Sequence, residues 1–380
     1  MDTATAAEGK REQAGRGARR FHLINTIKFW GGGERFIFDL ASGLWERNFD
    51  TRVYGRPGRE LLHRARAAGL PSFPLSMNFD YDPLPLLKFA GHSDGDVFLA
   101  MAPRDLKLLR LMTLLRTKAQ LFWFLGVCYP ENNREYRWLL KDPSIRLIAA
   151  SRFLQSEILG RVPQVADRIT VLPAGVPIPT LEAASARREL AEKHRLSPHK
   201  LFLGMFSRLV AGKGHLMIFK ALKQVRERGV DFHLWILGTG EKEALEREAA
   251  RLGLADCITF AGFQADVMPW MAGVDAVLLP SEKESFPYVV LEAMALGKTM
   301  VASNVGGVPE MIQHERDGIL LPSKDPEPWA STILELAQDG QKRAVLGEAA
   351  RRSVREKFSP ERMIARFLEI ADADSAVSRA

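Results

Sequence analysis

Two glutamates at a fixed separation are the residues of this sequence best suited to binding chemistry. In "SEKESFPYVVLEAMALGK", Glu284 follows a short apolar run and Glu292 lies eight positions later on an expected helix. Two helical turns separate the carboxylates by on the order of 12 Å, too far for the paired acid and base of a hydrolase. They are placed instead to accept hydrogen bonds from hydroxyls at two ends of one ligand. A solvated helix face is the alternative.

The residues between the two glutamates form an expected helix start. A helix N-terminus presents unpaired backbone N–H groups, which favour an anion. Proline is tolerated at the first helical position because no donor is needed there. The candidate contacts at this point are Ser285, Phe286, Pro287 and Tyr288.

Two cations follow an expected strand in "GMFSRLVAGKGHLMIF". Arg208 and Lys213 lie in the loop, and Gly212 and Gly214 flank the lysine. Cations at a helix N-terminus suit a diphosphate, because their charges add to the field of the helix dipole. Two exposed basic loop residues are the plainer interpretation.

Glycine-rich turns after other expected strands allow the backbone to approach a ligand closely. "KFWGGGER" contains Gly32 and Gly33 before an expected helix, and "LGTGEKE" contains Gly238. Triple glycine permits positive φ angles, and the following helix offers free N–H groups. Phe263, after a further strand, offers a ring to a nucleotide base. A tight turn explains the triple glycine equally well and is the plainer interpretation for Gly238 and Phe263. Gly306-Gly307 in "SNVGGVPE" lead from an expected strand into an expected helix.

Short apolar runs alternate with helical patterns along the whole chain, which predicts parallel sheets with crossover helices. The expected strands of the first half are 21–27, 51–54, 96–101, 120–125, 145–150 and 169–173, and those of the second half are 201–206, 232–237, 258–260, 276–280, 299–303 and 318–322. The expected helices include 34–46, 153–160, 214–228, 241–252 and 289–296. Two doubly wound domains bind ligands at the carboxyl ends of their strands.

A proline-rich break, "LPAGVPIPTLEAASARREL", separates the two halves. The predicted organisation is a disordered basic tail over 1–20, a first Rossmann-like domain over 21–178 and a second over 179–358. A C-terminal helix over 359–377 is expected to pack back on the first domain. The 380 residues suffice for two cores.

The net charge of +7 is unevenly distributed. Residues 1–178 hold 26 Lys and Arg against 18 Asp and Glu, while the remainder holds 27 against 28. A basic first half favours an anionic partner, or is simple solubility charge. Cys128 and Cys257 lie apart without a Cys/His cluster, so neither a disulfide framework nor a zinc site is predicted.

Taken together and in order, these motifs resemble the retaining glycosyltransferases of family 4. The most specific parts of this resemblance are "ESFPYVVLEAMALGKTMVASNVGGVPE" and "SRLVAGKG". The resemblance covers nearly the whole chain after residue 20 and includes enzymes of bacterial envelope and lipopolysaccharide synthesis. It implies the GT-B fold, in which two Rossmann-like domains face each other across a cleft and a C-terminal helix crosses back.

The resemblance also implies residue roles. Glu284 resembles the first glutamate of the Glu-x7-Glu motif, which contacts the donor sugar, and Glu292 the second, which holds the ribose. Arg208 and Lys213 match the cations that bind the donor diphosphate. The remaining implied contacts are the glycine loop of the acceptor domain at Gly32 and Gly33, backbone contacts from Ser285 to Tyr288, and base contacts at Phe263.

The implied reaction moves a hexose from a nucleotide diphosphate to a hydroxyl of a glycan or glycolipid with retained anomeric configuration. The donor is expected to be a UDP-sugar, or else a GDP- or ADP-sugar. No metal or other cofactor is expected, since cations stabilise the leaving diphosphate. Relatives often carry a histidine after the strand at 120–125. This chain has "LFWFLGVCYPENNREYRW" instead, which leaves Tyr129, Glu131 or Asn132 as replacements.

A lipid-linked acceptor and the basic first half suggest contact with an anionic membrane surface. In "RDLKLLRLMTLLRTKAQ", Arg104, Lys107, Arg110 and Lys118 share one helical arc, although a buried core helix explains the pattern equally. The N-terminus lacks a signal-like apolar core, so a cytoplasmic protein, peripheral on the inner membrane, is expected. The oligomeric state is not predicted.

Two other functions fit parts of the sequence. A nucleotide-sugar epimerase would share the two-domain architecture. A nucleic-acid-binding protein would use the basic half, but no helix-turn-helix, zinc finger or aromatic-interleaved basic strand supports it. Nucleic acid is therefore not an expected partner.

Overall fold

The computed structural model describes residues 19–28, 30–77, 82, 84–89, 92, 95–113, 119–127 and 134–377. The chain divides into two compact units. Unit 1 comprises the residues up to Gly175 together with those from Pro360 onward, and unit 2 comprises Val176–Ser359. The predicted boundaries at 178/179 and 358/359 fall close to these divisions.

Unit 1 is built on a parallel sheet with the strand order β3-β2-β1-β4-β5-β6-β7. The strands are β1 (Arg20–Asn25), β2 (Asp50–Gly55), β3 (Ser72–Pro74), β4 (Val97–Ala100), β5 (Gln120–Leu125), β6 (Ile145–Ala149) and β7 (Ile169–Val171). In the central strand, Leu23 lies opposite Val53 on one side and Leu99 on the other. These apolar strands are buried on both faces, as is usual for parallel sheets.

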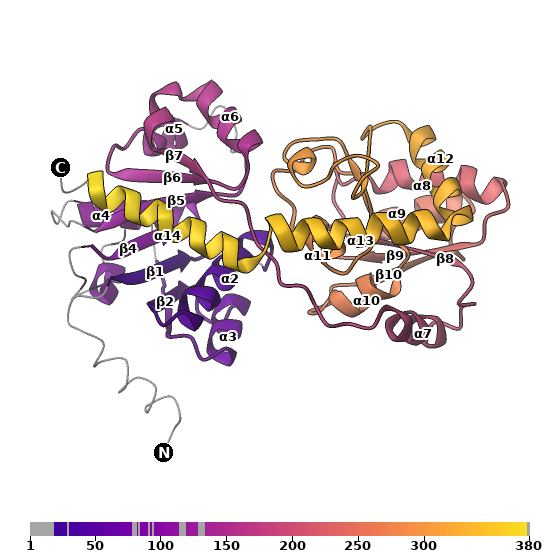
Figure 1. Ribbon diagram of the computed structural model, residues 1–380, viewed down its shortest axis with the longest axis horizontal. Helices are drawn as coiled ribbons and strands as arrows, with labels where there is room; N and C mark the ends of the chain where they lie inside the picture. Colours follow the sequence, from indigo (N-terminus) through magenta and orange to yellow (C-terminus); the bar gives the residue numbers. More distant parts are fainter. Residues whose placement is uncertain are drawn as a thin grey trace, which may run out of the picture. The chain divides into compact units, whose positions relative to one another are not determined.

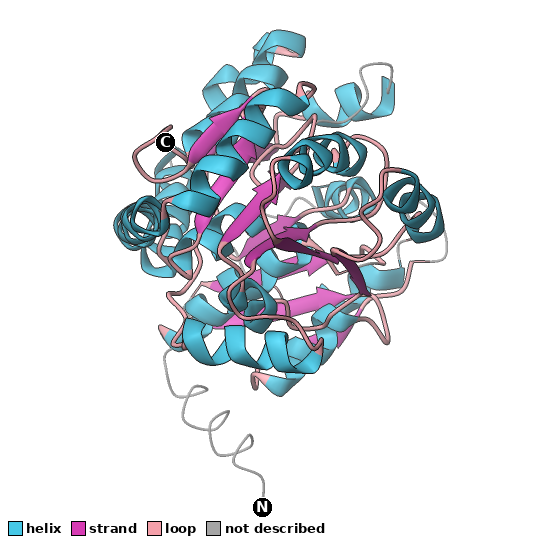
Figure 2. Ribbon diagram, turned by 90° about the vertical axis from the view of Figure 1, so that its right-hand side faces the viewer, coloured by secondary structure: helices cyan, strands magenta, loops and turns pink. Residues whose placement is uncertain are grey.

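The helices of unit 1 connect successive strands and flank the sheet (Figure 1), and Figure 2 shows helices in cyan around the magenta strands. They are α2 (Gly32–Glu46), α3 (Glu60–Ala67), η1 (Leu84–Phe89), α4 (Pro103–Thr113), α5 (Arg134–Leu140), α6 (Arg152–Arg161) and η2 (Pro163–Arg168). The side chain of Ser151 caps α6 by accepting a hydrogen bond from the Leu154 amide, which fixes where that helix begins.

The last helix, α14 (Pro360–Val377), belongs to unit 1 although it follows all of unit 2 in the chain. It packs against α2 and β5, and Figure 1 shows it in yellow beside them. Phe367 is fully buried, with its ring 5.9 Å from that of Phe21. Gln120 donates a hydrogen bond to the Ala371 carbonyl at 2.8 Å. The chain therefore completes its first core with its last helix.

Unit 2 repeats the pattern with the strand order β10-β9-β8-β11-β12-β13, all parallel. The strands are β8 (Leu201–Phe206), β9 (Phe232–Leu237), β10 (Ile258–Gly262), β11 (Ala276–Leu279), β12 (Thr299–Ser303) and β13 (Ile319–Leu321). The order reverses between β8 and β11. In doubly wound sheets, ligands bind outside the carboxyl ends of the strands at such a point.

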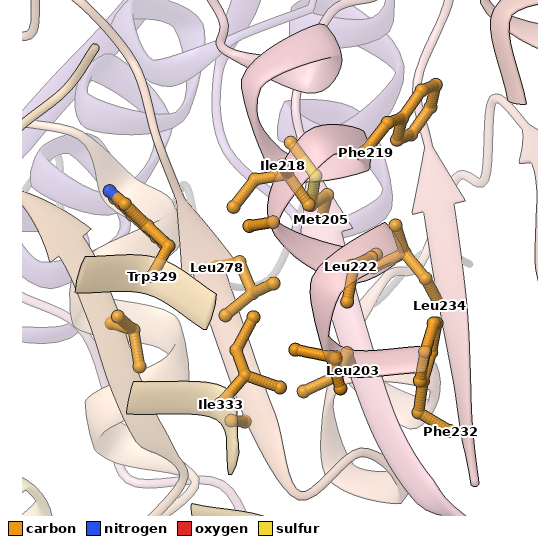
Figure 3. Close-up of a cluster of buried hydrophobic side chains, with 14 of the residues drawn as sticks. Leu203, Met205, Ile218, Phe219, Leu222, Phe232, Leu234, Leu278, Trp329 and Ile333 are labelled. Carbon is orange, nitrogen blue, oxygen red and sulfur yellow. The ribbon is translucent and has the colours of Figure 1, made fainter. Parts of the chain in front are cut away.

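Two groups of helices pack within unit 2. One group is α8 (His215–Glu227), α9 (Lys242–Arg251) and α12 (Pro326–Gln338), and the other is α7 (Ala183–Lys193), α10 (Met268–Gly273), α11 (Tyr288–Ala295) and α13 (Gly340–Lys357). Ile218, Leu222 and Val225 repeat at helical spacing on α8 and are all fully buried. Figure 3 shows the first two of these packed with Leu203, Trp329 and Ile333.

The predicted α/β class and most predicted strands are confirmed, and 120–125, 201–206, 232–237 and 299–303 agree with the structure at both ends. The edge strand β3 was missed because three residues ending in a proline give no periodic signal. Helix α2 begins at Gly32 rather than at residue 34. Gly306-Gly307 lead only into a short 3-10 turn, η3 (Val308–Glu310), and not into a helix.

Candidate functional site

The loop after β8, residues 207–214, carries both predicted cations. Arg208 is exposed, while the Lys213 side chain is 21% exposed. Backbone hydrogen bonds fix this loop on two sides. The Leu209 amide donates to the Thr239 carbonyl at 2.8 Å, and the Glu282 amide donates to the Gly212 carbonyl at 2.8 Å. The loops after β8, β9 and β11 are thus joined at the carboxyl edge of the sheet.

Lys213 and Glu284 form an ion pair, with Nζ and Oε1 2.6 Å apart. The Glu284 side chain is only 12% exposed, so the pair is partly removed from water. Charge-assisted hydrogen bonds of this length are about twice as strong as neutral ones. The structure therefore brings together two groups that lie 71 positions apart in the sequence.

The Glu284 backbone is held by the glycines that follow β12. The Gly307 amide donates to the Glu284 carbonyl at 3.2 Å. Gly306 has a φ of 57°, and a β-carbon there would lie 1.7 Å from the Glu284 carbonyl oxygen. No other residue fits this position without moving the Glu284 loop. The sequence placed Gly306 only between an expected strand and an expected helix, so this contact was not predicted.

Residues 285–288 lead into α11 as predicted, with one correction. Pro287 is not the first helical residue but the residue before it, because its ψ of 123° is extended. Ser285, Phe286, Pro287 and Tyr288 are all half-buried, and the Phe286 ring lies 5.8 Å from that of Phe358. No side chain caps α11 at Pro287. Glu292 is half-buried about one turn into the same helix.

Gly238 is needed for the close approach of two loops. Its φ is 150°, and a β-carbon there would lie 2.0 Å from the Ser207 carbonyl oxygen. The glycine therefore brings the loop after β9 against the residue that precedes Arg208. Phe263 follows β10 and is 60% exposed. A large ring left exposed at a strand end is available to a ligand.

His215 directly follows the loop that carries the two cations. It is the first residue of α8, and it is buried with its Nε2 3.4 Å from the Ser207 hydroxyl. Burial and the nearby Lys213 lower its pKa to about 4. A neutral imidazole therefore lies beneath the loop that carries the cations.

In unit 1, Gly32 and Gly33 lie in the first turn of α2, and neither they nor Gly31 takes a positive φ. Gly31 is extended, with a φ of −162°. At position 33 a β-carbon would lie 2.6 Å from the Met101 sulfur, so glycine leaves room for this flexible side chain. The expectation that positive φ explains the triple glycine was wrong.

A buried carboxylate lies at the start of α2, which sequence reasoning had treated as an open anion site. Glu34 is 5% exposed and accepts a hydrogen bond from Asn25 Nδ2 at 3.1 Å. Burial raises its pKa, while hydrogen bonds from its own backbone and that of Gly31 oppose the rise. A glutamate in the first turn reaching back to the preceding residue is half of a capping box.

A second buried carboxylate holds the loop after β1. Asp105 accepts hydrogen bonds from the Thr26 amide at 3.1 Å and the Ala102 amide at 3.2 Å. Burial raises the pKa of Asp105 to about 6. Asp105 thus ties the carboxyl end of β1 to the start of α4.

The basic residues of α4 are held by their own unit. Lys107 is 5% exposed, and Arg110 pairs with Asp142 at 2.8 Å while its guanidinium lies 3.6 Å from the Trp138 ring centre. Arg104 donates to the Met77 carbonyl. These contacts favour the core-helix interpretation of α4. Lys118, Tyr129, Glu131 and Asn132 lie outside the described residues.

The described residues contain neither a metal-binding cluster nor a membrane-spanning helix. No group of three or more His, Cys, Asp or Glu side chains there is placed to hold a metal ion. No helix in the same part of the chain is both long and apolar enough to cross a membrane. The absence of a metal requirement stays a prediction.

Comparison with known proteins shows similarity to glycosyltransferases. Residues 198–339 match the family described as Glycosyl transferases group 1. Over 250 residues the chain is 33% identical to a D-inositol 3-phosphate glycosyltransferase of Paenarthrobacter aurescens, covering 63% of this chain and 60% of that protein. The predicted resemblance to these glycosyltransferases is confirmed.

A second relative is similar over a longer stretch. The chain is 26% identical over 354 residues to the lipopolysaccharide core biosynthesis glycosyltransferase LpsE of Rhizobium meliloti, covering 90% of this chain and 95% of that protein. By contrast, it spans only 51% of a second D-inositol 3-phosphate glycosyltransferase, from Pseudarthrobacter chlorophenolicus.

Solved structures confirm the GT-B fold. The chain superposes with a TM-score of 0.82 and 22% identity on Anabaena HepE in complex with UDP-glucose, covering 94% of this chain and 99% of that one. It superposes with a TM-score of 0.80 and 19% identity on a glycosyltransferase of Rickettsia africae, covering 94% and 98%. At 22% and 19% identity, these superpositions show a shared fold alone.

Proposed function

We propose that this chain, a GT-B protein related to the group 1 glycosyltransferases, transfers a sugar from a nucleotide diphosphate to an acceptor hydroxyl. One observation carries the proposal. Lys213, which shares the loop after β8 with the exposed Arg208, meets Glu284 at 2.6 Å at the carboxyl ends of the strands where the sheet order reverses. Cations for a diphosphate and a carboxylate for sugar hydroxyls stand together there.

In this proposal the diphosphate binds Arg208, Lys213 and the start of α11. The backbone N–H groups of Ser285, Phe286 and Tyr288 would donate to phosphate oxygens, since no side chain caps that helix. Glu284 would accept hydrogen bonds from the donor sugar and Glu292 from the ribose. Phe263, 60% exposed, and the close backbone at Gly238 would flank the base.

The reaction proceeds on the side of the sugar that the leaving group occupies, which retains the configuration. The bond between the anomeric carbon and the phosphate oxygen breaks, and the acceptor oxygen bonds to that carbon. The acceptor proton passes to the departing phosphate oxygen. Because Arg208 and Lys213 stabilise the charge that develops on the diphosphate, the proposed mechanism requires no metal ion.

The donor class we propose is a UDP-hexose. Support comes from the UDP and UDP-glucose complexes of Anabaena HepE, which shares the fold. Ligands that bind only the folded state raise its melting temperature. A thermal-shift screen of UDP, GDP and ADP with their glucose derivatives tests the proposal. A rise with UDP-glucose is expected, and no rise with any of the six compounds would reject a nucleotide-sugar enzyme.

The acceptor class we propose is a glycan or glycolipid of the cell envelope. Support comes from the similarity to LpsE along most of both chains. Incubation of donor with and without an acceptor mixture distinguishes the rival enzyme. A transferase gives product only with acceptor, whereas a new nucleotide sugar without acceptor would indicate an epimerase.

Membrane contact is a separate part of the proposal and rests on the basic charge of residues 1–178. Surface charge of this kind is attracted to anionic lipid and is screened by salt. Flotation with vesicles of phosphatidylglycerol and phosphatidylcholine at low salt is expected to carry the protein upward. Recovery of all the protein in the unfloated fraction would contradict peripheral attachment on the cytoplasmic face of the inner membrane.

A further inference from the structure

The Lys213–Glu284 ion pair joins two groups that a donor would engage separately. In the part of the chain that the structure describes, each forms its ion pair with the other, at 2.6 Å. Their side chains are 21% and 12% exposed, so neither is fully solvated. Removing the partner of a partly buried charge has a cost, because water replaces the lost contact incompletely.

A bound nucleotide sugar would separate Lys213 from Glu284 and give each of them a new partner. Its diphosphate would pair with Lys213, and its sugar hydroxyls would donate to Glu284. The product nucleotide diphosphate has no sugar, so it would pair with Lys213 and leave Glu284 without a compensating donor. Breaking the ion pair therefore lowers the affinity for the product nucleotide diphosphate more than the affinity for the nucleotide sugar.

We propose that the Lys213–Glu284 ion pair acts as a product-release latch. It opens when a nucleotide sugar binds, and after transfer it closes again and displaces the nucleotide diphosphate. This inference rests on the proposed function and adds a second role for Glu284. Besides binding the sugar, Glu284 lowers the affinity of the site for the spent nucleotide.

Glu284→Gln separates the latch from the site's other interactions. Glutamine keeps the side-chain shape and a hydrogen-bond acceptor but does not hold Lys213 by charge. UDP should therefore bind this variant about threefold to tenfold more tightly than it binds the wild type, because Lys213 no longer has to leave a carboxylate. UDP-glucose should bind more weakly relative to UDP.

Glu282→Gln is the matched control. Glu282 lies two positions away on the same loop, is exposed, and pairs with Lys324 at 3.5 Å rather than with Lys213. The Glu282→Gln variant has the same change of charge but leaves the Lys213–Glu284 ion pair intact. Its affinities for UDP and UDP-glucose should stay within twofold of those of the wild type.

Isothermal titration of UDP and UDP-glucose into the three full-length proteins gives the result. Tighter UDP binding by Glu284→Gln alone supports the latch. Unchanged or weaker UDP binding by a folded Glu284→Gln protein would overturn it while leaving the proposed function intact. If the wild type binds neither compound nor their GDP and ADP counterparts, the proposed function itself fails. Should Glu284→Gln not fold, Glu284→Ala provides the second test, since it also removes the carboxylate from Lys213 and the latch again predicts tighter UDP binding than in the wild type.

Discussion

Gly306 lies so close to Glu284 that a β-carbon would come within 1.7 Å of the Glu284 carbonyl oxygen. The loop after β12 therefore sets the position of the loop after β11. We expect Gly306→Ala to lower transfer strongly, because the Glu284 loop must move to admit the methyl group. Positive φ alone costs an alanine about 1–2 kcal/mol.

Gly229→Ala separates these two effects. Gly229 has a φ of 79° in the same unit, with nothing within 4 Å of an added β-carbon. It should lose stability in urea unfolding yet keep its turnover. Equal turnover of the two folded variants would show that the Gly306 contact does not position Glu284.

Glu284→Ala is expected to abolish transfer while leaving the fold intact. The carboxylate lies in a loop and its loss removes no buried apolar group, so the melting temperature should change little. The assay is sugar transfer at saturating donor, with Glu282→Ala as the comparison. Near-normal turnover of Glu284→Ala would reject the site assignment.

Arg208→Ala tests the diphosphate contact without disturbing a packed group. Arg208 is exposed, so we expect no change in melting temperature. Removing one stabilising donor from a developing charge typically lowers the rate by about 10² to 10³. The measured quantity is kcat/KM for the nucleotide sugar. Lys220→Ala, an exposed cation on α8, should retain the wild-type value.

The free energy of unfolding should decrease as the pH is lowered through the range in which His233 and His215 titrate. Burial lowers the pKa of each from the ordinary 6.5 to about 4. The unfolded chain therefore binds protons first, and the free energy of unfolding declines as pH falls from 6.5 towards 4. Each histidine contributes up to about 1.4 kcal/mol per pH unit.

Urea unfolding of the wild type, His233→Gln and His199→Gln between pH 7.5 and 5 measures this decline. His233 is 4% exposed and bonds to the Thr259 hydroxyl at 2.9 Å, whereas His199 is exposed. The His233 variant should show a shallower decline and the His199 variant an unchanged one. The same slope in all three would contradict the assignment.

Phe367→Ala should destabilise unit 1 by about 3–5 kcal/mol, because it removes a fully buried ring from the interface of α14 with β1 and β5. Phe263→Ala removes the same atoms from a ring that is 60% exposed and should change stability little. Thermal unfolding of both variants measures the difference. Similar melting temperatures would show that α14 contributes little to the core.

The sequence predicted the elements that have a regular apolar pattern. It missed the features that depend on contacts between residues far apart in the chain. Strands such as β8 and β9 are uniform apolar runs, so their bounds follow from pattern alone. The meeting of Lys213 with Glu284 was foreseen only as two roles in one site, since nothing local to either residue encodes the other. The burial of His215 was missed because its partner, the Ser207 hydroxyl, lies across a loop. Glu34 was missed because a first-turn glutamate normally suggests a solvated helix start.

Because α14 supplies Phe367 and Ile364 to the core of unit 1, that core remains incomplete until the residues from Pro360 onward leave the ribosome. Residues 176–359 hold their whole sheet in one continuous stretch and can fold earlier in translation. Unit 1 is therefore made first but completed last, and its sheet keeps apolar surface exposed while unit 2 is made.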